Sequence, residues 1–394
     1  MLALLLTVGA ARPAEAQKKE IAQAKAAVKS GNGLDEAQKS LRALLDDSIH
    51  HRNLKVWTQL YQVVKKKYEQ GNEKLYLKQQ YDTGAIFNTT REMFGLLFAL
   101  DSVDVALHAE GKGKPSYRKK HAEEIVSLRP NLYYGGTYFV RRSDYRQAYD
   151  FFDTYLDCLC QPLFYGKDFS ADSVLLRDAA YWATFCGYKI EDAEKTLRYA
   201  DRASADSGKL QFTLQYIAEA CRLKEDNENY LKTLLAGFER YPDYVYFFPR
   251  LIDYYTHENR LEDALAVADE ALATDSASLL FLYAKSTLLL NMGRYDECVV
   301  WSDRMISQCD TIAGPYSNAG TALINKAIVV EQTKSARLAK AELQQLYQQA
   351  RPYFENYRRL APENKEKWGP ALYRIYLNLN MGKEFEEIDN VLKK

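Results

Sequence analysis

Small and apolar residues recur at three- and four-residue spacing along most of this chain of 394 residues, as they do on amphipathic helices. One clear stripe consists of Phe248, Leu251, Ile252 and Tyr255, and it ends at the polar turn Glu258-Asn259-Arg260. No segment shows the sustained apolar–polar alternation of a half-buried strand. The pattern therefore predicts an all-α protein.

The stripes repeat with a fixed period of 34 residues. The stripe that begins at Phe248 has one counterpart that begins at Leu282 and another that begins at Leu214. In each case a polar turn follows, and a second amphipathic stripe comes after it. A period of this length is typical of an array of helix pairs that bury their apolar faces against neighbouring pairs.

These residues resemble the tetratricopeptide repeat (TPR) family, whose pattern has this period and the same small and aromatic positions. The clearest matches open the second helix of a repeat and read Tyr145-Arg-Gln-Ala148, Leu261-Glu-Asp-Ala264 and Tyr295-Asp-Glu-Cys298. Pro242 and Pro362 match the proline that closes a repeat. The resemblance covers most of residues 18–394 and implies a right-handed TPR α-solenoid of antiparallel helix pairs.

Two regions depart from the standard repeat length. The helices look longer around Trp57–Tyr81 and Asp82–His108, and residues 331–345 enlarge a later repeat. The last unit of a solenoid needs a cap, because no neighbour covers its apolar face. We therefore expect N-terminal helical repeats with long helices over residues 17–130, a regular TPR array over 131–312, and an enlarged TPR with a C-terminal capping helix pair over 313–394.

The first 16 residues carry the pattern of a secretory signal peptide. The apolar run MLALLLTVGA is too short to span a bilayer as a helix, and Ala14-Glu15-Ala16 is a typical cleavage pattern. We expect cleavage after Ala16 and export to the periplasm or cell envelope of a bacterium, with no transmembrane segment. The alternative is a frayed apolar N-terminus on a cytosolic protein, because no Lys or Arg precedes the run.

Charge and composition remove several functional classes. The chain has 53 Lys and Arg against 53 Asp and Glu, so it lacks the basic charge that a nucleic-acid binder carries. Its 30 Tyr and only 10 Pro favour long packed helices. The six Cys do not have the spacing of a zinc or redox site. We expect mostly free, buried thiols, at Cys221 and Cys298 in particular, and a Cys160–Cys186 disulfide is the alternative.

The sequence shows no catalytic, cofactor-binding or metal-binding motif. Asp101, Asp104 and His108 could share one helix face, but we interpret them as part of a solvated polar face. The segment Gly111–Lys120 is a basic loop without the spacing of a phosphate-binding loop, and it could contact an anionic surface. We therefore expect a protein that is not an enzyme and has no cofactor.

Five Asp-Ser/Thr-aliphatic triplets resemble the acceptor pattern of a general O-glycosylation system of some exported bacterial proteins. The alternative is that their Asp and Ser side chains cap helices between repeats by accepting bonds from free N–H groups. We favour the caps because several triplets fall at predicted repeat junctions. The triplets begin at Asp47, Asp101, Asp172, Asp275 and Asp310.

In TPR proteins the first helix of each repeat usually lines a concave groove that accepts peptides or extended segments. By repeat position, the resemblance places in this groove Tyr133, Thr137, Arg141, Asp178, Trp182, Gln215, Glu219, Arg222, Tyr246, Asp253, His257, Tyr283, Thr287 and Asn291. This set combines flat aromatic rings with hydrogen-bonding groups, which suits the recognition of a polypeptide.

We therefore expect a non-catalytic scaffold or adaptor that binds a protein or peptide partner in this groove, in the bacterial cell envelope. Tyr133, Trp182, Tyr246 and Tyr283 are the first candidates for the contact residues. A periplasmic glycan or small-ligand binding protein is the alternative, because Tyr and Trp rings also stack on sugars. An enzyme with an unrecognised site is a third possibility, although the sequence shows no convergent titratable groups.

Overall fold

The computed structural model describes residues 11–47, 50–109, 111 and 117–393, and for residues 11–16 it describes the backbone only. The described residues form α-helices and three short 3-10 segments, with no strand among them, as the sequence predicts. The chain divides into two compact units, Met1–Tyr230 and Leu231–Lys394, and helix α12 (Asn227–Arg240) begins in one and ends in the other.

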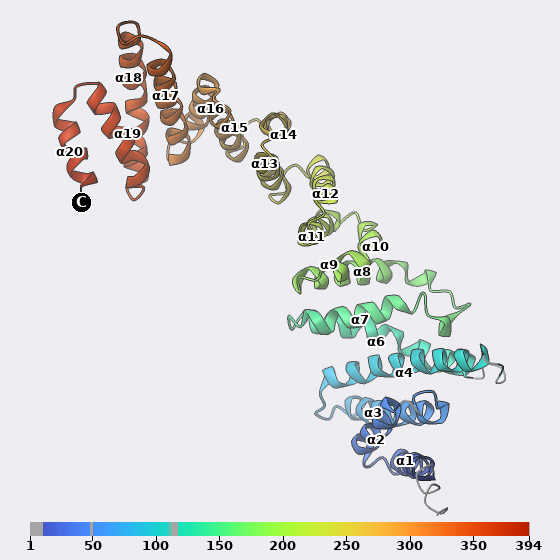
Figure 1. Ribbon diagram of the computed structural model, residues 1–394. Helices are drawn as coiled ribbons and strands as arrows, with labels where there is room; N and C mark the ends of the chain where they lie inside the picture. Colours follow the sequence, from blue (N-terminus) through green and yellow to red (C-terminus); the bar gives the residue numbers. More distant parts are fainter. Residues whose placement is uncertain (1–10, 48–49, 110, 112–116, 394) are drawn as a thin grey trace, which may run out of the picture. The chain divides into compact units, whose positions relative to one another are not determined.

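Unit 1 is a stack of helix pairs in which each pair packs on the next (Figure 1). The first two pairs are α1 with α2 and α3 with α4, and the later ones begin with α6, α8 and α11. The helices are α1 (Ala11–Ser30), α2 (Leu34–Asp46), α3 (Leu54–Tyr76), α4 (Thr83–Ala109), α5 (Arg118–Ile125), α6 (Arg129–Val140), α7 (Tyr145–Asp157), α8 (Ser173–Lys189), α9 (Ala193–Arg198), α10 (Ala200–Ser204) and α11 (Leu210–Leu223).

Unit 2 continues the pairing from α13 onward, and again each helix contacts the next one along the chain. Its helices are α13 (Phe247–His257), α14 (Leu261–Thr274), α15 (Leu279–Asn291), α16 (Tyr295–Gln308), α17 (Ala313–Thr333), α18 (Ala336–Leu360), α19 (Lys365–Asn378) and α20 (Gly382–Leu392). The pair of α19 and α20 follows the long helices where the sequence predicts a capping pair.

The 34-residue period appears in the backbone as a recurring left-handed turn. Glu191, Glu225, Asn259 and Gly293 each lie between the first and second helix of a pair, and successive members of this set are 34 residues apart. Their φ angles are 56°, 56°, 54° and 73°, a region that costs any residue other than glycine free energy. The period predicted from the side-chain pattern is therefore also a period of backbone geometry.

The enlarged repeats are present and arise from longer helices. The helices α3 and α4 have 23 and 27 residues, and α17 and α18 have 21 and 25, whereas α14, α15 and α16 have 14, 13 and 14. The N-terminal and the later enlarged helices thus agree with the sequence-based expectation.

One feature that the sequence pattern did not predict is the long connection from α7 to α8. It spans residues 158–172 and contains the short turns Pro162–Phe164 and Ser170–Asp172. The fully buried Arg129 holds it in place, because its Nη1 donates to Asp172 at 2.6 Å and its Nη2 donates to the Tyr155 carbonyl at 3.3 Å. The guanidinium also lies between two rings, 3.8 Å from the centre of Tyr155 and 4.2 Å from that of Phe169.

The second helix of the pair that begins with α8 is also interrupted. Helix α9 ends at Arg198, α10 begins at Ala200, and Tyr199 lies between them. Its hydroxyl donates to Asp153 at 2.8 Å and to Asp157 at 3.2 Å on α7. Burial and these carboxylates raise the pKa of Tyr199, so the phenol stays protonated and remains a donor.

The thiols are free, as expected, and the alternative disulfide is wrong. Cys186, Cys221 and Cys298 are buried and Cys160 is exposed; Cys160 and Cys186 are both free thiols, so no disulfide joins them. Burial raises the pKa of Cys298 to about 11, and it is therefore protonated at neutral pH.

The predicted signal peptide overlaps the undescribed start of the chain. Its apolar run, residues 1–10, lies outside the described residues, and Ala16 falls within the backbone of α1. None of the described helices combines the length and the apolar character that crossing a bilayer requires.

Candidate partner-binding face

The first helices of three successive pairs in unit 1 carry half of the fourteen predicted contact residues. Tyr133 and Thr137 lie on α6 and Arg141 follows directly after it, Asp178 and Trp182 lie on α8, and the three members on α11 are Gln215, Glu219 and Arg222. We call the side chains of Tyr133, Tyr134, Asp178, Trp182, Phe185 and Tyr188 the first-helix face of unit 1.

Asp178 links Tyr133 and Trp182 of this face to Lys209, the residue just before α11. Its Oδ2 accepts a hydrogen bond from Trp182 Nε1 at 3.0 Å and another from the Tyr133 hydroxyl, and its Oδ1 accepts one from Lys209 Nζ at the start of α11. Burial, reinforced by the bond to Asp178, raises the pKa of Tyr133, which keeps its hydroxyl a donor at neutral pH. Asp178 therefore fixes the orientation of both aromatic rings.

The aromatic rings continue from Trp182 along α8 and onto α11. Trp182 and Phe185 meet edge to face at 5.5 Å between ring centres, and Phe185 lies 5.7 Å from Tyr216. Tyr188 stacks on Tyr216 at 4.7 Å with an interplanar angle of 22°. On α6, Tyr134 is 54% exposed, so its ring is available to a partner while its neighbours hold their positions.

Two predicted residues on α11 pair with each other at the border of a cavity, and Arg222 is exposed there. Arg222 Nε donates to Glu219 Oε2 at 2.8 Å, and the carboxylate of Glu219 is largely buried. Together with Tyr188 and Lys189 they border a cavity of about 390 Å³. Gln215, one turn earlier on α11, is half-buried.

In unit 2 the structure corrects the place of one predicted contact residue. Tyr246 precedes α13 and is only 5% exposed, and the Arg250 guanidinium lies 3.8 Å from the centre of its ring. Its ring therefore offers no free face to a partner. The sequence prediction missed this because an aromatic residue in a helical pattern can be either packed or exposed. Asp253 and His257 are exposed, and His257 Nδ1 lies 3.2 Å from the Asp253 carbonyl oxygen, one turn earlier.

The remaining predicted residues of unit 2 lie on α15. Tyr283 is 39% exposed, yet one side of its ring covers Gly314, where an added Cβ would lie 2.6 Å from the ring. Thr287 accepts a hydrogen bond from Asn318 Nδ2 at 2.9 Å, which ties it to α17. Asn291 is exposed at the end of α15. Tyr283 and Asn291 thus remain accessible, whereas Thr287 belongs to a contact between helices.

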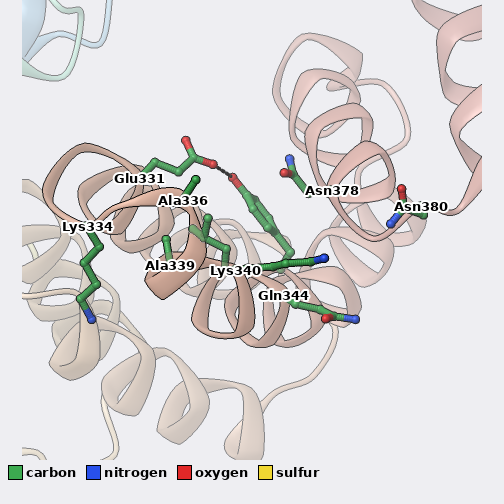
Figure 2. A pocket seen from close by; sticks show the side chains of 10 residues that line it. Glu331, Lys334, Ala336, Ala339, Lys340, Gln344, Asn378 and Asn380 are labelled. Carbon is green, nitrogen blue, oxygen red and sulfur yellow. Dashed lines mark hydrogen bonds between the residues drawn. The ribbon is translucent and has the colours of Figure 1, made fainter.

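Unit 2 also contains a polar cavity of about 330 Å³ that the sequence analysis did not identify. Figure 2 shows Glu331 of α17 on one side, and Asn378 and Asn380 on the other. The hydroxyl of Tyr347 donates to Glu331 at 3.1 Å, and Arg374 donates to both of them, at 2.9 and 2.7 Å. These bonds connect α17, α18 and α19, so Glu331 and Tyr347 at this cavity are engaged in packing.

The solvated-face interpretation of Asp101, Asp104 and His108 is wrong. Asp101 is 4% and Asp104 is 2% exposed. Arg118 makes two hydrogen bonds of 2.8 Å to Asp101, and His108 Nδ1 lies 2.8 Å from the Asp104 carbonyl oxygen. In the part of the chain that the structure describes, no group of three or more His, Cys, Asp or Glu side chains is placed to hold a metal ion.

The basic loop is described only in part. Residues 112–116 lie outside the described residues, whereas Arg118 and Lys120 belong to the first turn of α5. Because Arg118 pairs with Asp101, its charge ties α5 to α4, and less of the predicted basic charge is available to an anionic surface.

The capping interpretation of the Asp-Ser triplets fails at two of them. Asp101 lies inside α4, and Asp172 makes no side-chain cap on α8 and bonds to Arg129 instead. Asp275 does accept a bond from a backbone N–H, that of Ala277 at 3.0 Å. Ser276 and Thr311 are exposed in the connections before α15 and α17. Residues 48–49 of the first triplet lie outside the described residues.

No known protein-family model matches this sequence, and no curated protein matches it. Among solved structures, the C-terminal part of a TPR repeat-containing protein from Cytophaga hutchinsonii is similar over 65% of this chain and 92% of its own, with 11% identity and a TM-score of 0.45. The TPR domain of P58(IPK) covers 92% of this chain and 98% of its own, with 12% identity and a TM-score of 0.29. Yeast Tom70 is similar over 96% of this chain and 91% of its own, with 12% identity and a TM-score of 0.35. The antiparallel helix pairs and the 34-residue period of its turns give this chain a TPR-like fold.

Proposed function

We propose that this protein is a non-catalytic scaffold that binds a protein or peptide partner on the first-helix face of unit 1. The observation that carries the proposal is the link through Asp178, which holds Tyr133 and Trp182 in fixed orientations on adjacent helices. Rigid aromatic rings with polar neighbours lose little conformational entropy on binding, which makes them effective contact residues. The exposed ring of Tyr134 extends this surface.

The distribution of these side chains favours an extended partner over a small ligand on this face. The rings of α8 and α11 form a row of contacts, and the hydrogen bonds to Asp178 join Tyr133 of α6 to Trp182 in this row. A small-molecule site instead concentrates its groups around one concave pocket. The charges of Asp178 and Lys209 are paired with each other, so recognition rests on ring surfaces and hydrogen bonds.

Site-directed photo-crosslinking in the native cells tests this proposal. A photo-reactive residue at Tyr134, on α6, is expected to form one dominant protein adduct, and the same residue at Arg146, on the second helix α7, is not. The Trp182→Ala substitution should weaken binding of the captured partner at least about tenfold. The matched control is Trp301→Ala on α16, which removes a half-buried Trp of unit 2 and should leave binding unchanged.

Two outcomes contradict the proposal. Equal adducts from both positions would indicate non-specific contact, and full binding by a folded Trp182→Ala variant would remove the face from the interaction. Far-UV circular dichroism and the thermal midpoint of each variant show whether it is folded.

We further propose that the scaffold is exported to the bacterial cell envelope. The apolar run and the Ala14-Glu15-Ala16 pattern support this. Intact-mass measurement of protein from the envelope fraction should show a chain that begins at Gln17. A chain that retains residues 1–16 would contradict the export proposal and leave the binding proposal untouched.

A further inference from the structure

A second concave site lies on other helices of unit 1. A cleft of about 730 Å³ runs along α4, with α2 and α3 on one side and α7 on the other. The floor consists of one stripe of α4, formed by Asn88, Arg91, Glu92, Gly95, Leu96 and Ala99. The volume is within the range of about 300–1,000 Å³ that is usual for ligand sites. No residue of the first-helix face contributes to it.

One end of the stripe carries a polar atom that lacks a partner. Asn88 Oδ1 is buried and accepts no hydrogen bond within the described part of the chain. A buried acceptor without a donor costs free energy that a ligand N–H or O–H would recover. On the opposite wall, Gln147 donates its Nε2 to Asp144 and Thr154 donates its hydroxyl to the Asp150 carbonyl, so their oxygen atoms can accept further bonds.

The charged groups of the cleft are all in ion pairs, one within the lining and one with Asp150 of α7 outside it. Arg42 bonds to Glu92, and Arg91 Nη1 lies 3.0 Å from Asp150 Oδ2. The charged side chains of the lining are Arg42, Arg91 and Glu92, and each of them has an ion-pair partner, so none needs a counter-ion. An ionised ligand would have to compete with these pairs, whereas a neutral ligand can bond to their remaining N–H groups and oxygen lone pairs.

The other end of the stripe is apolar and open. Gly95 is exposed, and an added Cβ there would meet no atom within 4 Å. Leu96 and Ala99 continue this small apolar surface, and the half-buried ring of Trp57 borders it. The cleft thus offers an apolar surface beside a row of hydrogen-bonding groups.

We propose that this cleft binds a short neutral saccharide. A sugar ring has an apolar C–H face that packs on Trp57 and the Gly95–Ala99 surface, and hydroxyl groups around its edge. Each hydroxyl is both donor and acceptor, which matches the mixture of Asn88, the Arg N–H groups and the oxygens of α7. The site is independent of the partner-binding proposal, because the two use different residues.

Saturation-transfer NMR with the full chain tests the assignment. The probes are neutral di- to tetrasaccharides of glucose, mannose, galactose and N-acetylglucosamine at millimolar concentration, followed by calorimetric titration of each that responds. We expect at least one series to show transfer. Its affinity should fall at least about tenfold in Gly95→Leu, because the new side chain fills the open end of the cleft.

The variants separate loss of binding from loss of folding. Gly95→Leu adds a side chain to open space on a helix and should keep or raise the thermal midpoint. Asn88→Leu removes the acceptor and should also weaken binding, with no loss of stability because no hydrogen bond is broken. The matched control is Gly382→Leu, at a helix position of unit 2 where an added Cβ likewise meets nothing within 4 Å, and it should bind as the parent does.

Three results would overturn the proposal. They are the absence of transfer from every saccharide, undiminished binding by folded Gly95→Leu, and a protein adduct from a photo-reactive residue at Gly95. The last result would show that a polypeptide occupies the cleft.

Discussion

Gly187 lies on α8 where the backbone of α9 comes closest. An added Cβ would lie 2.5 Å from Thr196 N and 2.8 Å from Thr196 Cα, and a backbone cannot rotate away as a side chain can. We predict that Gly187→Ala lowers the free energy of unfolding by about 1–3 kcal/mol, although Ala is the better helix former. Urea unfolding monitored by circular dichroism measures this change in the free energy of unfolding.

Gly95→Ala is the matched control for this prediction. Its added Cβ meets nothing within 4 Å on α4, so only the helix propensity acts, and it should stabilise by about 0.5–1 kcal/mol. Equal effects from the two substitutions would mean that α9 does not pack so closely on α8.

Arg129 is the residue that holds the long connection between α7 and α8. The Arg129→Met substitution keeps the length of the side chain but removes the bonds to Asp172 and to the Tyr155 carbonyl. We predict that the free energy of unfolding falls by about 2 kcal/mol or more, with faster hydrogen exchange in residues 158–172 than elsewhere in unit 1. The cost stays moderate because the Asp172 side chain is 41% exposed and can be solvated after the change.

The control for Arg129 is Arg142→Met. Arg142 also lies over a ring, 3.7 Å from the centre of Tyr138, but it is exposed to water. Arg142→Met should lower the free energy of unfolding by no more than about 1 kcal/mol and leave hydrogen exchange in the connection unchanged. A protected connection in Arg129→Met would show that other contacts hold it.

For single residues, the contact between Asp178 and Trp182 could be predicted from the sequence, because residues four apart share a helix face. It could not place Lys209 beside them, since Lys209 precedes α11 and reaches Asp178 only through the packing of two helix pairs. Nor could it separate Tyr246 from Tyr283, because an aromatic ring on a helix pattern can be either packed or exposed.

The recurring turn between the first and second helices allows a test of how its positive φ angle affects stability. Glu225 and Gly293 occupy the same position of the repeat, and both have positive φ, 56° and 73°. Glu225→Gly should stabilise the protein by about 0.5–1 kcal/mol because glycine adopts this conformation without steric cost. Gly293→Ala should destabilise by about 1 kcal/mol for the same reason.

The two substitutions should change stability in opposite directions, and this distinguishes an effect of turn geometry from one of helix propensity. Thermal unfolding of both variants measures them, and destabilisation by Glu225→Gly would show that the Glu225 side chain stabilises the turn by more than its strain.

The period, the long helices and the final helix pair were all predictable, because each follows from a local pattern of apolar and polar positions. The connection over residues 158–172 was not, since its apolar residues Leu163 and Phe164 are buried like those of a helix. What orders it is Arg129, which lies nearly thirty residues before the connection begins. The break at Tyr199 likewise depends on carboxylates of another helix.

Across the whole molecule, the abundance of tyrosine predicts how the fold responds to alkali. Burial, as the largest cause, raises the pKa of at least eleven Tyr hydroxyls above their usual value of 10.0. These are Tyr61, Tyr68, Tyr133, Tyr149, Tyr155, Tyr199, Tyr255, Tyr316, Tyr347, Tyr353 and Tyr376. In the unfolded chain they lose their protons near pH 10, whereas in the folded chain they keep them.

The unfolded state therefore binds fewer protons above about pH 10, and stability falls as the pH rises further. Below this pH the contribution is fully present. We predict a cooperative loss of helix above about pH 10 that coincides with a rise in tyrosinate absorbance. Ionisation of all the tyrosines with the helices intact would contradict it, because it would mean that the buried phenols ionise in the folded state.

Tyr149 offers the sharpest variant for this prediction. Its hydroxyl is buried beside Asp153 on α7 and has no hydrogen bond of normal geometry within the described residues. Tyr149→Phe thus removes one group that ionises on unfolding and breaks no hydrogen bond, so the alkaline midpoint should rise while stability at neutral pH stays the same or increases. Tyr199→Phe is the contrast, because it loses two bonds to α7 and should lower stability at neutral pH.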